Sequence, residues 1–411
     1  MFKENKKEKI GIFGGTFNPP HTGHILVAET AIKQLSLDKL IIVPAGNPPH
    51  KEIPSTTPNA KTRFELTCLA FKHITNITIS DIEISKQETS YAINTVNSIL
   101  SDYPNALIYL LMGTDMYLTL ETWHDAEELL SRVTPVVFSR SDEDHKSINN
   151  YSIFLENKYG VSTEIINNHI IDISSSELRN LLPLRQGTEY MNSTCYAYII
   201  KKQLYGARPA PAWLRSFIFI FLDPERITHV LASVETAILL AKRWDIDPEE
   251  AFDAAILHDI TKNFSYEQHL EVIKYHDIIV DIYKRNEVKL FHPKTGAIIA
   301  KTEFSVSDNV ADAISWHTTG RQDMTTLEKI IYLADYIEPT RDFPNVDILR
   351  KLAYESLDDA MIMGLEITIE DLTSRGITPN SASLNALSDV RERKREQKCL
   401  NLRKREKAEH V

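Results

Sequence analysis

Two adjacent glycines and two histidines lie close together near the start of the 411-residue chain, in the stretch GGTFNPPHTGH that ends at His24. Glycine lets the backbone come close to an anion, and a helix that begins nearby offers unpaired N–H donors. His21 and His24 are three residues apart, so a helix places both imidazoles on one face. The pattern predicts a phosphate-binding loop, with a tight turn capped by histidines as the simpler alternative. The predicted backbone contacts to phosphate are Gly14, Gly15, Thr16 and Phe17.

A second candidate anion site is the serine-rich stretch ISSSELR, residues 173–179. The serines can cap a helix, and Arg179 lies one turn into it, so hydroxyls, N–H donors and a guanidinium converge on one anion. An ordinary N-cap would use the same residues. Opposite the glycine–histidine loop, these residues are predicted to complete a triphosphate clamp. The further candidate nucleotide contacts are Ser175, Ser176, Arg179 and Asp115.

Histidines and acids recur in the second half of the chain. The dipeptide His-Asp occurs three times, and only at His258 does it end an apolar helical run that is followed by a lysine, Lys262. Neutral imidazoles and carboxylates on facing helices suit Fe, Mn or Co, which generate hydroxide near neutral pH. Scattered surface histidines are the alternative. The predicted metal ligands are His229, His258, Asp259, His292, His317 and Asp335.

The elements that must hold the first set of residues alternate between strand and helix patterns. Such alternation predicts an α/β fold with a doubly wound parallel sheet, and ligands in such sheets bind beyond the carboxyl ends of the strands. The loops at residues 44–51, 113–115 and 173–179 follow predicted strands. The predicted strands are residues 10–13, 40–43, 77–79, 106–112, 135–138 and 170–173, and the predicted helices are 25–32, 61–72 and 92–100.

A proline- and alanine-rich break, residues 206–212, separates this pattern from an all-helical region. We predict a first domain at 1–206, a linker at 207–223, a second domain at 224–388 and a charged tail at 389–411, either a solvated helix or disordered. The predicted helices of the second half are residues 226–244, 248–259, 266–276, 294–304, 309–316, 327–337 and 346–363.

Composition limits the classes of function. The net charge of −11 argues against nucleic acid or an acidic membrane as the main partner. Three cysteines without a C-x-x-C pair suggest reduced thiols. The sequence has no secretory leader pattern and no apolar run near the ~20 residues that span a bilayer, so we expect a cytoplasmic enzyme. The oligomeric state stays open, a homo-oligomer included.

The motifs GGTFNPPHTGH and ISSSELR resemble those of the nucleotidyltransferase superfamily. PAGNPPHK at 44–51, Thr-Ser-Tyr at 89–91, Gly-Thr-Asp at 113–115 and a tryptophan at 123 narrow the resemblance to bacterial nicotinate-nucleotide adenylyltransferases. Two positions depart from that family: Asn18, where aspartate is common, and Thr114, where alanine is frequent. The resemblance implies that ATP and nicotinate mononucleotide react with Mg²⁺ to give nicotinate adenine dinucleotide and pyrophosphate.

This reaction needs no protein nucleophile, because the phosphate of the mononucleotide attacks the α-phosphorus directly. Catalysis is then positioning and charge stabilisation. The resemblance implies that His21 and His24 stabilise the charge of the transition state. It also implies that Ser175, Ser176 and Arg179 bind the leaving pyrophosphate. The implied nicotinate pocket consists of Asn47, Thr89, Tyr91 and Trp123.

The H…HD…D pattern of the second half resembles the HD phosphohydrolase superfamily. FHP at 291–293, WHTTGR at 316–321 and MTTLEKIIYLADYIEP at 324–339 make it similar to bacterial HD hydrolases that cut diadenosine tetraphosphate symmetrically into two ADP. The resemblance implies one metal on His229, His258, Asp259 and Asp335, and a second on His292 and His317 beside Asp259. Lys262, as a catalytic residue, and Arg321 would meet substrate phosphates. Pro293 departs from the small residue that the family often has there.

Two alternatives remain open. The first domain could adenylylate a different phosphorylated substrate, nicotinamide mononucleotide or phosphopantetheine. The second domain could be a non-catalytic nucleotide sensor that keeps the HD fold. Competition between the two mononucleotides would decide the substrate of the first domain. Metal analysis would decide whether the second domain is a hydrolase or a sensor.

Overall fold

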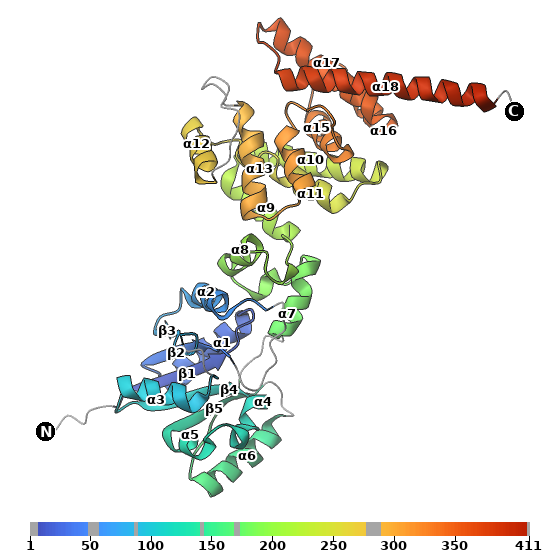
Figure 1. Cartoon of the computed structure of the whole chain (residues 1–411). Coiled ribbons are helices and arrows are strands. Elements are labelled where there is room, and N and C mark those ends of the chain that lie inside the picture. The colour runs from blue at the N-terminus through green and yellow to red at the C-terminus, as the bar shows by residue number, and fades with distance from the viewer. Residues whose placement is uncertain are drawn as a thin grey trace. The chain divides into compact units, whose positions relative to one another are not determined.

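The chain is described here from a computed structural model, which covers residues 7–47, 57–85, 89–139, 144–167, 173–276 and 289–408. The chain divides into two units, Met1–Arg208 and Pro209–Val411, and each is described by itself (Figure 1). Predictions that concern residues 48–51 and 170–172 lie outside the described residues. In the described ranges, no helix combines the length and the apolar character needed to cross a membrane.

The first unit contains a six-stranded sheet in which all neighbouring strands are parallel, as predicted. The strand order is β3-β2-β1-β4-β5-β6, so the sheet changes direction of winding between β1 and β4. Such a switch point is where ligands bind in open α/β sheets. The strands are β1 (Lys9–Gly15), β2 (Lys39–Pro44), β3 (Ile77–Ile79), β4 (Leu107–Gly113), β5 (Val133–Ser139) and β6 (Glu164–Asn167).

Helices cover both faces of this sheet. On one face the apolar side chains of Ile10, Ile12 and Ile41 form a core with α3 (Ala92–Asp102), α5 (Ala126–Arg132) and α6 (Asp144–Tyr159). Each buried aliphatic side chain stabilises the fold by about 1.5–3 kcal/mol. The remaining helices of the unit are α1 (Thr22–Leu35), α2 (Ala60–Phe71), α4 (Thr114–Tyr117), α7 (Ser175–Leu181), α8 (Ser193–Lys201) and the short η1 (Leu120–Thr122), η2 (Leu182–Leu184), η3 (Thr188–Tyr190) and η4 (Leu204–Gly206).

The structure contains one strand that was not predicted. β6 pairs in parallel with β5, with Val136 to Ser139 opposite residues 164–167. The strand predicted at 170–173 falls mainly on residues outside the described ranges, so it stays a prediction. Pairing of β6 with β5 is a tertiary contact that the local sequence pattern does not reveal.

The described part of the second unit is helical, as predicted. It starts with α9 (Pro211–Phe221), which lies within the predicted linker and buries Trp213, Leu214 and Ile218. The single helix predicted over residues 346–363 is two helices, because Ser356 leaves the helical conformation (φ −157°) and caps the second. The helices are α10 (Pro224–Arg243), α11 (Pro248–Leu257), α12 (Tyr266–Tyr275), α13 (Phe291–Glu303), α14 (Asp308–Trp316), α15 (Thr326–Ile337), α16 (Val346–Glu355), α17 (Leu357–Ser374) and α18 (Ser381–Ala408).

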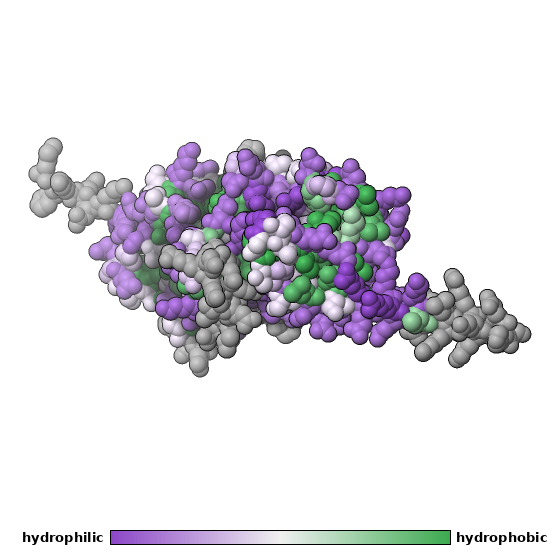
Figure 2. All heavy atoms as spheres, turned by 90° about the horizontal axis from the view of Figure 1, so that it is seen from above, coloured by the Kyte–Doolittle hydropathy of each residue, from purple (hydrophilic) through white to green (hydrophobic). Residues whose placement is uncertain are grey.

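The predicted charged tail is the end of α18. Residues 391–399 of this helix are exposed, and hydrophilic side chains coat the part of it that extends from the body (Figure 2). Near its start Ala386 and Val390 are buried, so the helix is anchored at its N-terminal end.

Candidate functional site

The glycine–histidine loop lies at the switch point of the sheet. Gly15 ends β1 and pairs with Pro44, the last residue of β2, while Gly113 ends the other neighbour, β4. The loops that follow these strands therefore begin at the same edge. A Cβ atom built on Gly14 would meet no atom within 4 Å, so open space adjoins the backbone there. This space leaves room for an anion beside the backbone, and contact of Gly14 with phosphate stays a prediction.

His21 and His24 hold each other at the start of α1. His21 is the N-cap residue, and its backbone N–H donates to Nδ1 of His24 over 3.2 Å. The centroids of the two rings are 3.8 Å apart, and His21 is buried. Because Nδ1 of His24 accepts this hydrogen bond, the neutral ring carries its proton on Nε2, which is then a donor. The pair thus combines a helix cap with polar imidazole atoms at a helix N-terminus.

The serine-rich stretch lies against this loop. Ser174 caps α7 in a reciprocal capping box with Glu177. Nη1 of Arg179 donates to the carbonyl oxygen of Asn18 over 2.6 Å, and the Ser175 hydroxyl donates to that of Pro19 over 2.9 Å. Two segments about 160 residues apart in sequence are thereby joined, so the structure brings both predicted halves of the clamp together.

The departure at Asn18 also has a described role. Its side-chain amide donates to the hydroxyl of Thr57 over 3.1 Å, and the residue is 6% exposed. The buried Oδ1 atom of Asn18 has no hydrogen-bond partner among the described residues. A buried acceptor without a hydrogen-bond partner destabilises the fold, so this atom suits contact with a donor group of a bound ligand.

Arg63 of α2 is a structural residue of the site that the sequence did not reveal. Its side chain is 1% exposed, and its guanidinium donates to the carbonyl oxygens of Thr16 and Gly46 over 2.8 and 3.2 Å. Burial lowers the pKa of Arg63 because it disfavours the charged form. The residue ties the loop after β1 to the loop after β2. No local signal marks this arginine, because α2 also contains Lys61 and Glu65.

We expect Arg63→Met to lower the free energy of unfolding by about 2–4 kcal/mol, because a buried side chain loses its hydrogen bonds and two partly buried carbonyl groups lose their donors. Urea denaturation of the full chain, followed by far-UV circular dichroism, measures this change. Lys61→Met is the matched control, since Lys61 lies on the same helix and is exposed. Equal stability of the two variants would contradict the role given to Arg63.

The predicted nicotinate residues also come together at this edge of the sheet. The backbone N–H of Asn47 donates to the Ser90 hydroxyl, and the Ser90 N–H donates to the Asn47 carbonyl, which places Thr89 and Tyr91 beside the loop after β2. The ring of Tyr91 lies 4.2 Å from that of His124, the neighbour of Trp123. Both Tyr91 and Trp123 pack against the core of the first unit.

Asp115 is the predicted nucleotide contact that follows β4. It lies in the first turn of α4, directly after β4, and is exposed. Its neighbour Thr114, the second departure from the family pattern, is buried and donates to Asp144 and to the carbonyl of Phe138. Thr114 therefore fastens the loop after β4, while Asp115 faces solvent at the same edge.

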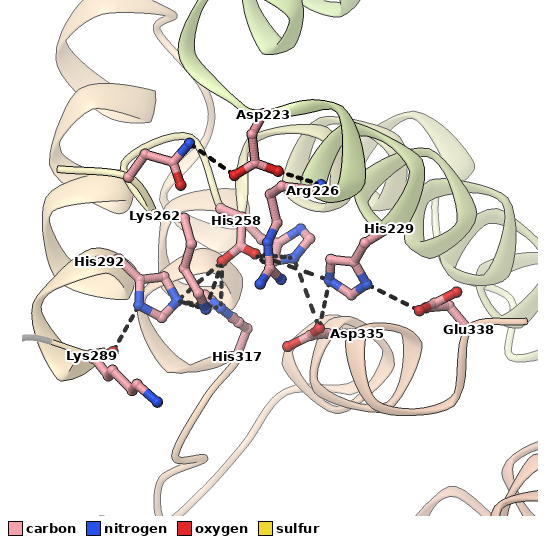
Figure 3. A network of polar contacts seen from close by, with 12 residues as sticks. Asp223, Arg226, His229, His258, Lys262, Lys289, His292, His317, Asp335 and Glu338 are labelled. Carbon is pink, nitrogen blue, oxygen red and sulfur yellow. Dashed lines mark hydrogen bonds and ion pairs between the residues drawn. The ribbon is translucent and has the colours of Figure 1, made fainter. Parts of the chain in front are cut away.

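In the second unit, six predicted metal ligands converge from five segments (Figure 3). Two triads have ligand atoms within 4.8 Å of one another: His229, His258 and Asp335, and His258, Asp259 and His317. His292 joins through its Nε2, which lies 3.1 Å from Nε2 of His317. The scattered-surface alternative is excluded, because all four imidazoles are buried.

Asp259 lies at the centre of the cluster. Its Oδ2 is 3.6 Å from Nε2 of His258 and 4.0 Å from Nε2 of His229. Its Oδ1 is 3.1 Å from Nε2 of His292 and 3.7 Å from Nε2 of His317. One carboxylate therefore faces two pairs of imidazoles, one pair with each oxygen. This arrangement can serve two adjacent ions.

Backbone carbonyls fix three of the imidazoles. Nδ1 of His258, His292 and His317 each lies 2.6–2.7 Å from the carbonyl oxygen of the residue three positions earlier. A carbonyl only accepts, so each Nδ1 carries the proton and each Nε2 presents a lone pair to the cluster. The Nε2 of His258 is buried without a hydrogen-bond partner among the described residues. Lone pairs held in this way fit a divalent cation.

The fourth imidazole is fixed by Glu338, a residue of the motif at 324–339 for which the sequence predicts no role. Nδ1 of His229 donates to Oε1 of Glu338 over 3.0 Å, and the glutamate is fully buried. Burial opposes its ionisation, but hydrogen bonds from Thr340 and His229 hold the pKa of Glu338 below its usual value. Glu338 thus orients His229 and strengthens it as a ligand.

We expect Glu338→Gln to weaken metal binding by the cluster about 10- to 100-fold, because the amide still accepts from His229 but carries no charge. Competition between the full chain and a chelator for Mn²⁺ or Co²⁺ measures the affinity. Glu355→Gln serves as control, since Glu355 is an exposed glutamate of the same unit. Wild-type affinity in Glu338→Gln would show that Glu338 does not support the ligand.

The charges of the cluster favour a cation. Burial alone would raise the pKa of Asp259, yet His258, His292 and Lys262 hold it well below its ordinary value. Burial also opposes the ionisation of Asp335, but its hydrogen-bond partner His229 and the neighbouring imidazoles keep its pKa well below the ordinary value. Burial and the neighbouring imidazoles lower the pKa of His317. Ionised carboxylates and neutral imidazoles are the donor set that Fe, Mn or Co prefers.

Three cationic side chains contact the carboxylates of the cluster. Lys262, which was predicted, lies 3.3 Å from Oδ1 of Asp259. Arg226 lies 3.0 Å from Oδ2 of Asp259 and Arg341 lies 2.6 Å from Oδ1 of Asp335, and neither was predicted. Both arginines look like ordinary surface residues in the sequence.

Arg321 is placed differently from these cations. Its described partners are Glu328, which is fully buried and caps α15, Asp312 and the ring of Trp316. None of these belongs to the cluster, so its contact with substrate phosphates stays a prediction. Pro293 lies in the first turn of α13, where proline is tolerated, and the helix continues through it.

Comparison with known families matches each unit separately. The family described as cytidylyltransferase-like matches residues 12–181, and the HD domain family matches residues 226–340. The first range contains the loops from Gly14 to Arg179, and the second contains the cluster from His229 to Asp335.

Individual relatives match one or both halves. A Mycoplasma genitalium protein named "Probable nicotinate-nucleotide adenylyltransferase/Ap4A hydrolase" is 31% identical over 374 residues, 88% of this chain and 97% of that protein. A "Probable nicotinate-nucleotide adenylyltransferase" of Clostridium botulinum (strain Alaska E43) is 35% identical over 183 residues, 44% of this chain and 90% of that protein. A crystal structure of a "predicted HD superfamily hydrolase involved in NAD metabolism" from Clostridium acetobutylicum is 32% identical, with a TM-score of 0.44, and covers 46% of this chain and all of its own.

Proposed function

Because the chain belongs to the family in which a cytidylyltransferase-like nicotinate-nucleotide adenylyltransferase domain is fused to an HD domain, we propose that it is a bifunctional enzyme. The first unit joins ATP and nicotinate mononucleotide into nicotinate adenine dinucleotide and pyrophosphate. The second unit hydrolyses diadenosine tetraphosphate to two ADP with the help of bound metal.

In the first reaction, a phosphate oxygen of the mononucleotide forms a bond to the α-phosphorus of ATP, and the bond to the β-phosphate oxygen breaks. ATP enters as its Mg²⁺ complex. His21 and His24 stabilise the charge that develops on the phosphates, and Arg179 with Ser175 and Ser176 binds the leaving pyrophosphate. The nicotinate ring lies in the pocket that Tyr91 and its neighbours line.

The observation that supports this half most strongly is the junction of the two phosphate loops. Arg179 and Ser175 are hydrogen-bonded to the backbone of Asn18 and Pro19, just before His21. A guanidinium, serine hydroxyls and imidazoles are thereby collected at the N-termini of two helices, α1 and α7. Adenylyl transfer requires such groups, since positioning and charge stabilisation supply the catalysis.

For the second reaction, one metal would be held by His229, His258, Asp259 and Asp335, and a second by His292 and His317 beside Asp259. Bound Fe, Mn or Co acts as a Lewis acid and lowers the pKa of a bound water. Asp259 orients both halves of the cluster through its two oxygens. Lys262 donates a hydrogen bond to a substrate phosphate. Water is consumed and the central phosphoanhydride bond breaks, giving two ADP.

The specificity of the first unit is tested by competition. Purified full-length chain is supplied with ATP and equal concentrations of nicotinate mononucleotide and nicotinamide mononucleotide, and in a parallel reaction with phosphopantetheine. We expect the nicotinate dinucleotide to be the main product. A higher kcat/KM for either of the other acceptors would refute the proposed substrate.

The second unit is tested by metal analysis and by hydrolysis of diadenosine tetraphosphate with added Mn²⁺ or Co²⁺. We expect bound metal and ADP as the sole nucleotide product. A chain that binds adenine nucleotides without metal and without hydrolysis would instead be a sensor, and the hydrolase proposal would be wrong.

A further inference from the structure

The buried side chain of helix α12 is a histidine. Of the ten described residues of α12, only His269 is buried, at 1% exposed, while its neighbour Leu270 is exposed. A helix usually turns an aliphatic side chain inward, because a buried polar group destabilises the fold unless it is hydrogen-bonded. Burial lowers the pKa of His269 to about 4, so the ring is neutral at physiological pH. The imidazole is therefore held in this place as a neutral hydrogen-bonding group.

The hydrogen bond of His269 is made with α13, the helix that carries His292 and lies beside α12 (Figure 1). Nδ1 of His269 lies 2.8 Å from the hydroxyl oxygen of Thr295, which is fully buried one turn after His292. The imidazole also stacks on the ring of Phe291, the residue before His292, with 5.7 Å between the centroids. His269 therefore packs on α13 at residues on either side of the metal ligand.

A second hydroxyl extends this contact to the segment that carries Asp259. Oγ1 of Thr261 lies 3.0 Å from Oγ1 of Thr295 and donates to the carbonyl oxygen of His292 over 2.9 Å. Thr261 is fully buried and follows Asp259 by two residues. A hydroxyl has one proton, so when Thr261 uses its proton on the carbonyl, Thr295 donates to Thr261 and accepts from Nδ1 of His269. These three side chains form a relay that ends on the backbone of His292.

The relay adjoins one half of the metal cluster. Nε2 of His292 lies 3.1 Å from Oδ1 of Asp259 and 3.1 Å from Nε2 of His317, the groups assigned to the second ion. The first ion is assigned to a set that includes His229 and Asp335, from α10 and α15. Within the described ranges, neither of these two residues is hydrogen-bonded to a member of the relay. A change in the relay should therefore act on the second ion more than on the first.

We propose that His269 is a positioning residue for the second metal ion and acts on His292 through the two threonines. Buried hydrogen bonds that form a chain strengthen one another when every member is satisfied, and the chain here fixes the backbone of His292 relative to Asp259. Partners that orient a metal ligand commonly change metal affinity by about 10- to 100-fold. The inference rests on the proposed binding of two ions, and it extends the metal site to α12.

Metal titration of the full chain tests this role. The chain is stripped with a chelator, dialysed and titrated with Mn²⁺ in a calorimeter, and the second ion is identified as the one that His317→Ala fails to bind. We expect His269→Leu to raise the dissociation constant of the second ion about 10- to 100-fold and to leave that of the first within about twofold. His269→Asn places an amide N–H near the position of Nδ1 and should recover most of the loss.

Thr295→Val and Thr295→Ser are a matched pair, because valine keeps the shape of threonine without the hydroxyl and serine keeps the hydroxyl. Valine should weaken the second ion as His269→Leu does, and serine should not. Thr302→Val is the control, since Thr302 lies two turns further along α13, where it contacts His276 and donates to the Ile298 carbonyl. If circular dichroism shows that His269→Leu does not fold, the Thr295 pair carries the test.

Two results would overturn the inference. One is unchanged binding of the second ion, or equal weakening of both ions, in His269→Leu and Thr295→Val. The other is a wild-type chain that binds a single ion. If the wild type binds two ions and these variants lose the second, but the wild type does not hydrolyse diadenosine tetraphosphate, the proposed function fails and the inference stands.

Discussion

Replacement of His24 by alanine is expected to lower the kcat of adenylyl transfer about 10²- to 10³-fold and to leave hydrolysis of diadenosine tetraphosphate within about twofold of wild type. A decrease of this size is expected when an enzyme loses one hydrogen-bond donor that stabilises charge in the transition state. The imidazole also has a structural role, since its Nδ1 accepts the N–H of His21 and completes a capping box. Alanine removes both functions, so a second variant is needed.

His24→Gln separates the two functions. Glutamine is a common acceptor at this position of a capping box, so it can restore the cap without an imidazole. We expect thermal stability near that of wild type and transfer activity as low as in His24→Ala. The two variants are compared by melting temperature and by pyrophosphate release. Transfer activity that returned with the cap would show that His24 acts through the helix and not on the phosphates.

The second large effect is expected from His258→Ala, which should reduce hydrolysis to below about 1% of wild type and leave adenylyl transfer unchanged. Loss of a residue that only orients a ligand weakens metal binding 10- to 100-fold, and removal of a ligand costs more. His258 belongs to both potential metal triads, so its loss affects both. Metal content after dialysis, measured by atomic emission, should fall together with activity.

His276→Ala is the matched control for this variant, because His276 begins another His-Asp dipeptide of the same unit. We expect it to retain metal and hydrolysis. Full metal content and hydrolysis in His258→Ala would contradict the assignment of the cluster. Loss of adenylyl transfer in His258→Ala would contradict the independence of the two sites.

Much of the architecture could be predicted from local patterns. Parallel strands such as β1 and β2 are buried on both faces and appear as short continuous apolar runs. Local patterns were less informative where tertiary contacts decide. β6 was not predicted, and it pairs with β5. The residues of α9 follow a proline- and alanine-rich segment and were predicted to lie in a linker; in the structure they form a helix in which Trp213 and Ile218 are buried.

The functional residues also differ in whether local sequence patterns or only tertiary contacts reveal them. Histidines, glycines and the His-Asp pair are conspicuous because their chemistry is unusual at their positions. Arg63, Arg226, Arg341 and Glu338 are not, because a charged residue is most often a surface residue and only tertiary contacts show otherwise. Arg63 is buried between two loops and Glu338 beneath His229, and neither contact is encoded in sequence spacing.

The central claim, that one chain makes nicotinate adenine dinucleotide and cleaves diadenosine tetraphosphate, is tested most directly by one product analysis. The full chain is incubated with Mg²⁺, Mn²⁺, ATP, nicotinate mononucleotide and diadenosine tetraphosphate labelled in its adenines, and all nucleotides are separated and identified by mass spectrometry. We expect unlabelled nicotinate adenine dinucleotide and labelled ADP as the first products. Absence of the dinucleotide, or labelled ATP and AMP in place of ADP, would contradict it.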